Sequence, residues 1–350
     1  MIELKVKGKT FRFFSTVNVT LKLDTIASTF SFTGLKIDSE NSKILFKPLT
    51  YYPCEVWFVD EVLNINQKLI TGTILNPSNS VQRNIELTNM AGYSLTGVFE
   101  DVNIPPDMYP LQFDGLGLDK IAKKICDKFG IQLFIFDNAK TDAAKAFTQT
   151  KAQPEKTIKT FLSEIARARN ITLAHDNLGR LLLYKVLAQI PPKVKINETD
   201  KNVIRMSCSP NGQAVHSEIT VIKQSSTTDT NSGQATVKSP FVTNVKRPKV
   251  QILRFGENID CEKSATAIAS SEAKAFPVII EYQGWTIQNF LIRSGFYIEV
   301  EAPSIFWEKT KMVVESISFN ADAKNGRTLS ITAVLPCVYT GVLPGKSPFK

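Results

Sequence analysis

Long apolar runs, paired cysteines and histidines are scarce in this 350-residue chain. No run of about 18 apolar residues occurs, so we expect no transmembrane helix, and the N-terminal segment lacks the pattern of a signal peptide. The five cysteines are widely spaced and form no CxxC pair, which argues against a zinc site or disulfide framework and favours a reducing compartment. The two histidines, His175 and His216, are too few for a histidine-based metal site or triad to be expected.

Sequence motifs of catalysis are also scarce. HExxH, GxSxG and GxxxxGK[ST] do not occur. The segment "GLGLDK" (115–120) resembles half of a glycine-rich phosphate loop, but no clear strand precedes it and the third glycine is missing. Asp101 and Asp107 could serve a glycosidase as paired carboxylates, yet nothing selects them from other loop residues. We therefore predict no enzyme, and no catalytic, cofactor-binding or metal-binding residues and no cofactor.

The net charge of +9 is the one unusual feature of the composition. Such a charge is compatible with nucleic acid, an anionic membrane or an acidic protein partner. The 42 basic residues are scattered among 33 acidic ones, however, and the densest basic run is "KRPK" at 246–249. Nucleic-acid binding is therefore disfavoured as the primary function.

Residues 1–98 have the pattern of β-structure. Val17, Val19, Leu21 and Leu23 alternate with polar residues, as in a half-buried strand. Further short β-rich runs follow, and we expect turns at their punctuating residues, which are Gly34, Gly72 and the segment 76–80. Short strands at this spacing predict an antiparallel barrel or sandwich.

Residues 99–190 change to a helical period and predict a small α+β insert. Apolar residues from Leu118 to Phe129 form one helical stripe, which Gly130 ends, and a strand is expected over 131–136. A shift of 40 residues aligns this segment without gaps to a second helix that Asn170 ends. We therefore interpret the insert as a duplicated helix–strand unit.

Three polar residues near the second helix could suggest chemistry. Arg169 falls close to the apolar stripe at the C-terminus of the helix, where a cation is favoured and its stem can cover the core. Arg167 points to the opposite face, so the two guanidinium groups are not expected to hold one phosphate together. His175, beside Asp176, is interpreted as an edge or turn residue, and His216 in the same way.

Residues 191–350 return to β-structure after Pro191 and Pro192. We expect a mobile polar loop at 224–237, a helix after Asp260 and a hairpin through Asn325 and Gly326. The tail 344–350 is expected to be unstructured. Two tryptophans and their aromatic neighbours are interpreted as core, and an exposed glycan- or protein-binding surface stays open as the alternative. These aromatic residues are Trp285, Phe290, Phe296, Tyr297, Phe306 and Trp307.

Four stretches, in this order, resemble the central baseplate hub protein of contractile-tailed phages, above all of the Mu-like type within the late-control D tail hub superfamily. They are "STVNVTLKLDTIASTFSF" (15–32), "QRNIELTNMAGYSLTGVFEDV" (82–102), the helix ending in "RARN" with the hairpin around "DNLGR", and "EYQGWTIQNFLIRSGFYIEVEA" (281–302) with the strands after it. The resemblance rests on collinearity over nearly the whole chain, since none of the stretches is a catalytic motif.

The resemblance implies a β-dominated α+β fold with two tail-tube-like antiparallel β-barrel domains, 1–98 and 191–350, and the insert 99–190 between them. It implies a structural virion component of a phage or prophage. A homotrimer would form a pseudo-sixfold ring that joins the tail tube to the trimeric spike. Other baseplate and tape-measure proteins are implied partners, with DNA only as passing cargo and no direct membrane insertion. The expected location is the tail baseplate, assembled in the bacterial host cytoplasm. The alternative that stays open is a non-catalytic β-sandwich module that binds carbohydrate or protein.

Overall fold

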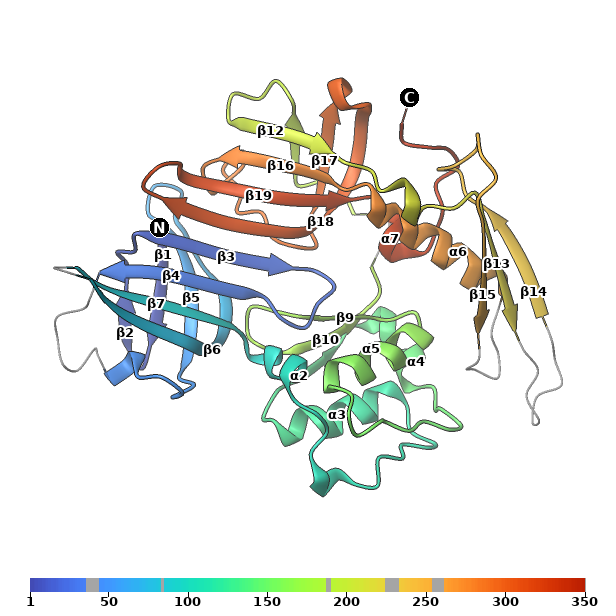
Figure 1. The fold of residues 1–350 in the computed structure, drawn as a ribbon, viewed down its shortest axis with the longest axis horizontal. Coiled ribbons are helices and arrows are strands. Elements are labelled where there is room, and N and C mark those ends of the chain that lie inside the picture. Colours follow the sequence, from blue (N-terminus) through green and yellow to red (C-terminus); the bar gives the residue numbers. More distant parts are fainter. Residues whose placement is uncertain (36–43, 83–84, 187–189, 224–232, 254–260, 350) are drawn as a thin grey trace. The chain divides into compact units, whose positions relative to one another are not determined.

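The chain forms two compact units, each rich in strands (Figure 1). The computed structural model describes residues 1–35, 44–82, 85–186, 190–223, 233–253 and 261–349. Unit 1 comprises Met1–Lys185 and Ile317–Leu329, and unit 2 comprises Val186–Ser316 and Ser330–Lys350. Among the described residues, no helix has the length and apolar character needed to cross a membrane.

Unit 1 begins with an antiparallel sheet. Its strands are β1 (Ile2–Val6), β2 (Lys9–Phe11), β3 (Thr16–Lys22), β4 (Thr29–Leu35), β5 (Pro53–Asp60), β6 (Ile65–Gln82) and β7 (Ile85–Ser94). The strand order is β3-β4-β7-β6-β5-β1-β2. The alternation predicted for β3 is confirmed, because Val17, Val19 and Leu21 are buried between exposed or half-buried neighbours. In β4, Phe30 lies opposite Val19 and is also buried, so the two strands present one apolar face to the core.

The expected turns at Gly34, Gly72 and 76–80 are wrong, because all three lie inside strands. Gly72 pairs with Cys54 on one side of β6 and with Ser94 on the other. A Cβ atom at Gly72 would lie 2.1 Å from the Tyr93 carbonyl oxygen, so glycine is required there by close strand contact and not by a turn. The segment 76–80 continues β6 after a shift in register at Ile74, and a bulge of this kind accommodates a proline such as Pro77.

The insert of unit 1 packs helices on a small sheet. It contains α2 (Val98–Asp101), α3 (Leu118–Lys128), α4 (Asp137–Ala144), α5 (Ile158–Ala168) and the three-stranded sheet β8 (Leu133–Ile135), β9 (Thr172–His175) and β10 (Leu181–Tyr184). The helices α3, α4 and α5 lie together beside β9 and β10 (Figure 1). The apolar stripes predicted for α3 and α5 are buried in one cluster with Leu173, Leu181 and Leu183. The sequence did not predict α4, whose buried residues are only Ala139 and Ala143.

The helices α3 and α5 end in the same way. Gly130 and Asn170 both have left-handed backbone angles, with φ of 64° and 53°. The next residue then closes the helix end with a backbone hydrogen bond. The Ile131 N–H donates to the Cys126 carbonyl, and the Ile171 N–H donates to the Ala166 carbonyl. The following strands differ, since β8 is parallel to β10 and β9 is antiparallel to it.

Unit 2 contains a second group of long strands. They are β11 (Val194–Asn197), β12 (Val203–Cys208), β16 (Val278–Gln283), β17 (Tyr297–Ala302), β18 (Trp307–Asp322) and β19 (Gly326–Val334). Their order is β12-β16-β19-β18-β17-β11. The predicted hairpin joins β18 to β19, where Asp322 accepts the N–H groups of Lys324 and Asn325 and Gly326 has a φ of 67°. The hairpin tip, from Ile317 on, belongs to unit 1, where β18 pairs with β3.

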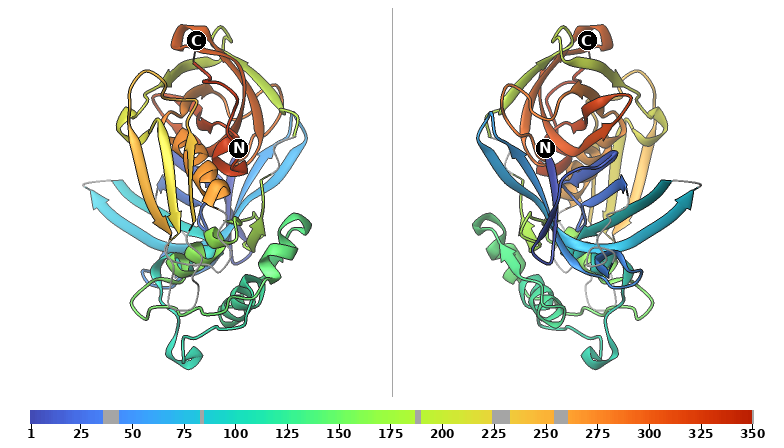
Figure 2. Two further views of the ribbon diagram at one scale, coloured as in Figure 1. Left: turned by 90° about the vertical axis from the view of Figure 1, so that its right-hand side faces the viewer. Right: turned by 90° about the vertical axis from the view of Figure 1, so that its left-hand side faces the viewer.

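A smaller sheet and a helix complete unit 2. The sheet contains β13 (Glu218–Lys223), β14 (Gly233–Lys238) and β15 (Pro248–Leu253), and α6 (Cys261–Ser271) lies along it (Figures 1 and 2). The helix predicted after Asp260 is confirmed, and its stripe of small residues, with Ala265 and Ala269, packs on Ile219 and Val221 of β13. The predicted loop 224–237 is wrong at its end, since 233–237 form most of β14, and 224–232 lie outside the described residues.

The C-terminal segment is packed, which corrects the expectation of an unstructured tail. After α7 (Cys337–Thr340), Phe349 forms a backbone bridge with Trp307. Its ring lies 5.2 Å from the ring of Trp307 and 5.3 Å from that of Phe276, centroid to centroid. Aromatic contacts of this kind explain why a polar, proline-containing tail is held.

The fold is mostly antiparallel β, as predicted, but the described strands form open sheets. In unit 1 the strand order ends at β2, and in unit 2 it ends at β12 and β11. Among the described residues, no strand pairing joins these ends within a unit. A closed barrel in each β domain is therefore not a property of the described chain.

Candidate functional site

His175 joins the insert to the first sheet of unit 1. Its Nδ1 lies 2.8 Å from the Thr25 carbonyl oxygen and its Nε2 lies 2.7 Å from Ser28 Oγ. Thr25 and Ser28 belong to the connection between β3 and β4 and its junction with β4, and His175 ends β9. Burial lowers the pKa of His175 from its usual value of 6.5, so the neutral imidazole is favoured. With both ring nitrogens occupied, His175 holds two elements together.

The turn after His175 adds a second set of contacts. Asn177 donates from Nδ2 to the Lys68 carbonyl at 3.1 Å, and its own carbonyl accepts the Thr71 hydroxyl at 2.7 Å. Asp176 does not face the imidazole, because it accepts the N–H groups of Leu178 and Arg180 and pairs with the Arg180 guanidinium at 2.6 Å. The prediction that His175 is an edge residue is confirmed by its place in β9, but its docking role was missed.

The two arginines of α5 diverge, as the helical geometry predicted. The Arg169 guanidinium donates to the carbonyls of Lys145 and Ala146 and lies 4.3 Å from the centre of the Phe147 ring. Arg169 therefore fixes the segment between α4 and α5. Arg167 is exposed on the other side of the helix.

The remaining candidates of the insert also have structural partners. Asp101 accepts the Tyr93 hydroxyl at 2.8 Å, whereas Asp107 pairs with Lys128, so the two carboxylates do not share a site. Within "GLGLDK", Gly117 precedes the first residue of α3, and its carbonyl accepts the N–H of Ile121. The element before this segment is a single 3-10 turn at Pro106–Met108, so the expected absence of a preceding strand holds for the described residues.

The tryptophans of unit 2 are core residues, as interpreted. Trp285 is 6% exposed and Trp307 is fully buried. Phe290 and Phe306 are exposed by 55% and 68%, so the core interpretation is wrong for these two residues. The alternative of an exposed aromatic binding surface is therefore wrong for Trp285 and Trp307.

All five cysteines are free thiols. Cys54, Cys126 and Cys337 are buried, and burial raises the pKa of each of these thiols to about 12. A thiol that stays protonated is a poor nucleophile, so these three act as small apolar side chains. Among the described residues, no group of three histidine, cysteine or carboxylate side chains could hold a metal ion.

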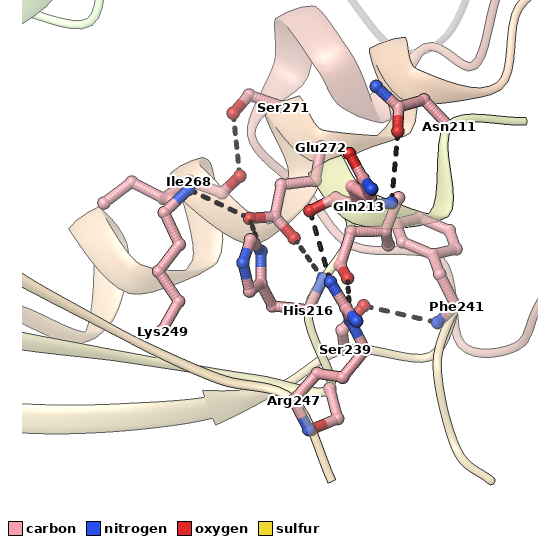
Figure 3. A network of polar contacts seen from close by, with 12 residues as sticks. Asn211, Gln213, His216, Ser239, Phe241, Arg247, Lys249, Ile268, Ser271 and Glu272 are labelled. Atoms are coloured by element: carbon pink, nitrogen blue, oxygen red, sulfur yellow. Dashed lines mark hydrogen bonds and ion pairs between the residues drawn. The ribbon is translucent and has the colours of Figure 1, made fainter. Parts of the chain in front are cut away.

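A buried carboxylate, Glu272, ties the small sheet of unit 2 to the end of α6 (Figure 3). One oxygen accepts the His216 N–H at 2.9 Å, and the other lies 2.7 Å from His216 Nδ1 and 3.1 Å from Lys249 Nζ. His216 precedes β13 and Lys249 lies in β15, so one side chain gathers three elements. Next to it, Arg247 donates to the carbonyls of Val215 and Gln213.

This cluster was missed from the sequence. His216 and Glu272 are 56 residues apart, and no spacing rule connects them. One sequence feature could have indicated it. Glu272 directly follows the helix with the small-residue stripe, so its side chain lies where that helix packs closely on a sheet. The contacts of His175 fix the insert to the first sheet of unit 1, and those of Glu272 fix the end of α6 to the small sheet of unit 2. Both do so by giving buried polar groups their hydrogen-bond partners.

Part of the chain matches a known family model, and nearly the whole chain has the fold of solved proteins. Residues 106–185 match the family model described as "Baseplate hub protein gp44-like, second domain". The crystal structure of the 43 kDa tail protein of prophage MuSo2 from Shewanella oneidensis has the same fold, with a TM-score of 0.79 at 20% identity over 98% of this chain and 99% of that one. The crystal structure of the tail protein from Neisseria meningitidis MC58 has a TM-score of 0.78 at 18% identity, over 98% of this chain and 99% of that one.

A third similar structure is a chain of the half-lidded Francisella PdpA-VgrG complex, with a TM-score of 0.63 at 10% identity over 100% of this chain and 59% of that one. No curated protein sequence matches the chain. The fold over nearly the whole chain is therefore that of these tail proteins, and the segment 106–185 is similar to a baseplate hub domain. The match of residues 106–185 to a baseplate hub domain confirms the predicted resemblance to hub proteins, and the fold agrees with it.

Proposed function

We propose that the protein is the baseplate hub of a contractile phage tail, or of a related injection device. Three copies would form a pseudo-sixfold ring that joins the tail tube to the trimeric spike and lets DNA pass. The observation that carries this proposal is a hub second domain, residues 106–185, inserted in a chain whose whole length has the fold of a phage tail protein.

Open sheet edges support assembly by strand pairing. The outer strand of unit 1, β2, and an outer strand of unit 2, β12, each have one neighbour among the described strands. An edge strand presents unpaired N–H and C=O groups, which a neighbouring subunit can satisfy. Each chain would contribute two tube-like β domains, 1–98 and 191–350, so the ring of a trimer would contain six. The insert 99–190 would lie outside the ring.

The partners follow from this position. We propose contacts with the tail tube protein, the spike and other baseplate and tape-measure proteins, in a particle assembled in the host cytoplasm. The likeness to a chain of a VgrG complex supports a spike partner. The role is structural and not enzymatic, since the matched proteins are tail and baseplate proteins.

Native mass spectrometry tests the proposal. The chain would be measured alone and with the spike protein encoded near it. We expect a complex with three copies of the 39.0 kDa chain and three of the spike. A chain that stays monomeric in both samples at micromolar concentration would contradict the hub and favour a binding module.

The rival function, a carbohydrate- or protein-binding β-sandwich, has weaker support. Such a module uses an exposed aromatic patch, and both Trp285 and Trp307 are buried. Glycan arrays with the intact chain would detect this function directly. The hub proposal expects no saturable binding in that experiment.

A further inference from the structure

An open groove lies between α3 and β8 in the insert. It has a volume of about 470 Å³. Its apolar lining is Leu116, Leu133 and Ile135, and its polar lining is Asp119 with three lysines of α3, which are Lys120, Lys123 and Lys124. The groove is separate from the contacts of His175, which lie on β9.

The strand beside the groove has an unpaired edge. Among the described residues, β8 pairs with β10 alone. Gln132 and Phe136 bond to β10 through their backbone, so the alternate peptide groups, those of Leu133 and Ile135, point away from it. No described residue forms a backbone hydrogen bond with Leu133 or Ile135 on that outer side. The edge can therefore accept another strand.

The side chains of β8 give an added strand two different faces. Leu133 and Ile135 are half-buried and line the groove. Phe134 and Phe136 alternate with them on the other face, are 40% and 43% exposed, and lie edge to face at 5.0 Å. An edge strand with apolar residues on both faces is a common docking site for an extended peptide.

The charge of the groove selects the kind of peptide. Lys123 pairs with Asp127, but Lys120 and Lys124 are exposed and have no carboxylate partner among the described residues. Besides the paired Lys123, the lining thus carries two ammonium groups, those of Lys120 and Lys124, one carboxylate, that of Asp119, and an aliphatic floor. This lining is complementary to carboxylates that alternate with aliphatic side chains.

We propose that β8 and the groove bind an extended acidic segment of a partner polypeptide by strand addition. Backbone groups of the segment pair with Leu133 and Ile135. Its aliphatic side chains enter the groove, and its carboxylates meet Lys120 and Lys124. A nucleic acid would use the lysines but could not use the aliphatic floor or the strand edge. This docking surface goes beyond the hub function and does not depend on the trimer.

Fluorescence anisotropy with the full chain tests the proposal. The probe is a labelled ten-residue peptide that alternates glutamate and valine. We expect saturable binding, which the double substitution Lys120→Glu with Lys124→Glu weakens by about tenfold or more. Lys151→Glu, an exposed lysine of the insert away from the groove, is the charge control and leaves binding within about twofold.

Two further probes separate the contributions. A lysine–valine peptide of equal length is expected not to bind, and a glutamate–valine peptide with alternate N-methyl groups is expected to lose binding because it cannot pair with a strand edge. The proposal is overturned if the glutamate–valine peptide does not bind at about 1 mM. It is also overturned if the N-methylated peptide binds as well, or if a DNA oligonucleotide competes for the same lysines. Circular dichroism of each variant checks that the fold is kept.

Discussion

His175 Nε2 and Ser28 Oγ lie 2.7 Å apart, although they are 147 residues apart in the chain. The contact joins the segment that matches the hub domain model, residues 106–185, to the first sheet of unit 1. Buried polar contacts with defined geometry make such a connection specific. Four predictions test the parts of this scaffold.

The stability of unit 1 should depend on the protonation of His175. Burial lowers the pKa of His175 in the folded chain below 6.5, so the unfolded chain binds more protons between the two pKa values. The contribution of neutral His175 to the free energy of unfolding should therefore be complete above pH 6.5. It should decrease as the pH drops through 6.5 and stop changing below the pKa of the folded chain. Urea unfolding between pH 7.5 and 5 measures this slope.

The variant His175→Ala supplies the control for that titration. It should cost about 1–3 kcal/mol at pH 7.5, because Ser28 and the Thr25 carbonyl lose their partner. Its unfolding free energy should also change less with pH than that of the unmodified chain. Equal slopes in the two proteins would show that His175 is not the titrating group.

Glu272→Gln should loosen the small sheet of unit 2. The substitution keeps the size of the side chain but removes the charge that faces Lys249 and His216. We expect a loss of about 2 kcal/mol and faster hydrogen exchange in β13 and β15. Glu262→Gln, exposed on α6, is the matched control and should leave exchange unchanged. Equal exchange in both variants would contradict a clamp at Glu272.

Gly72→Ala should destabilise the first sheet. The new Cβ would lie 2.1 Å from the Tyr93 carbonyl oxygen, and neither strand can move without breaking pairs on both sides. We expect a loss of about 2–4 kcal/mol in thermal or urea unfolding. Gly212→Ala, where nothing lies within 4 Å, is the control and should change stability by less than about 0.5 kcal/mol. A neutral Gly72→Ala would exclude a close approach of the strands.

Asn170 should tolerate glycine but not a β-branched residue. Its φ of 53° is left-handed, a conformation that costs such residues about 1–2 kcal/mol. Asn170→Gly is therefore expected to be neutral or slightly stabilising, and Asn170→Val to lose about that amount. Arg167→Val, exposed in the last turn of the same helix, separates the backbone effect from ordinary helix propensity. Equal losses in the two valine variants would contradict the left-handed cap.

The sequence predicts local structure well where a period or a stop signal is strong. The alternation of β3, the stripes of α3 and α5, the stops at Gly130 and Asn170 and the hairpin at Asn325 are all found. Each depends on residues within one or two turns of the chain. The similarity of the two helix ends, 40 residues apart, also follows from local rules.

Long-range packing overrides local signals elsewhere. Gly72 and Pro77 are turn residues by propensity, yet β6 continues through both because β5 and β7 pair with it. Phe349 is held by rings of Trp307 and Phe276, which a tail sequence cannot reveal. The partners of His175 and Glu272 are equally distant in sequence. Their roles depend on the fold and not on a motif.

The position of the protein in the particle is the most direct test of the hub. Tails would be purified from a strain that carries a small epitope tag after residue 350, labelled with an antibody fragment and imaged by electron microscopy. The hub proposal predicts label at the junction of tube and spike, in three copies. Label along the tube, or intact tails without any label, would contradict it.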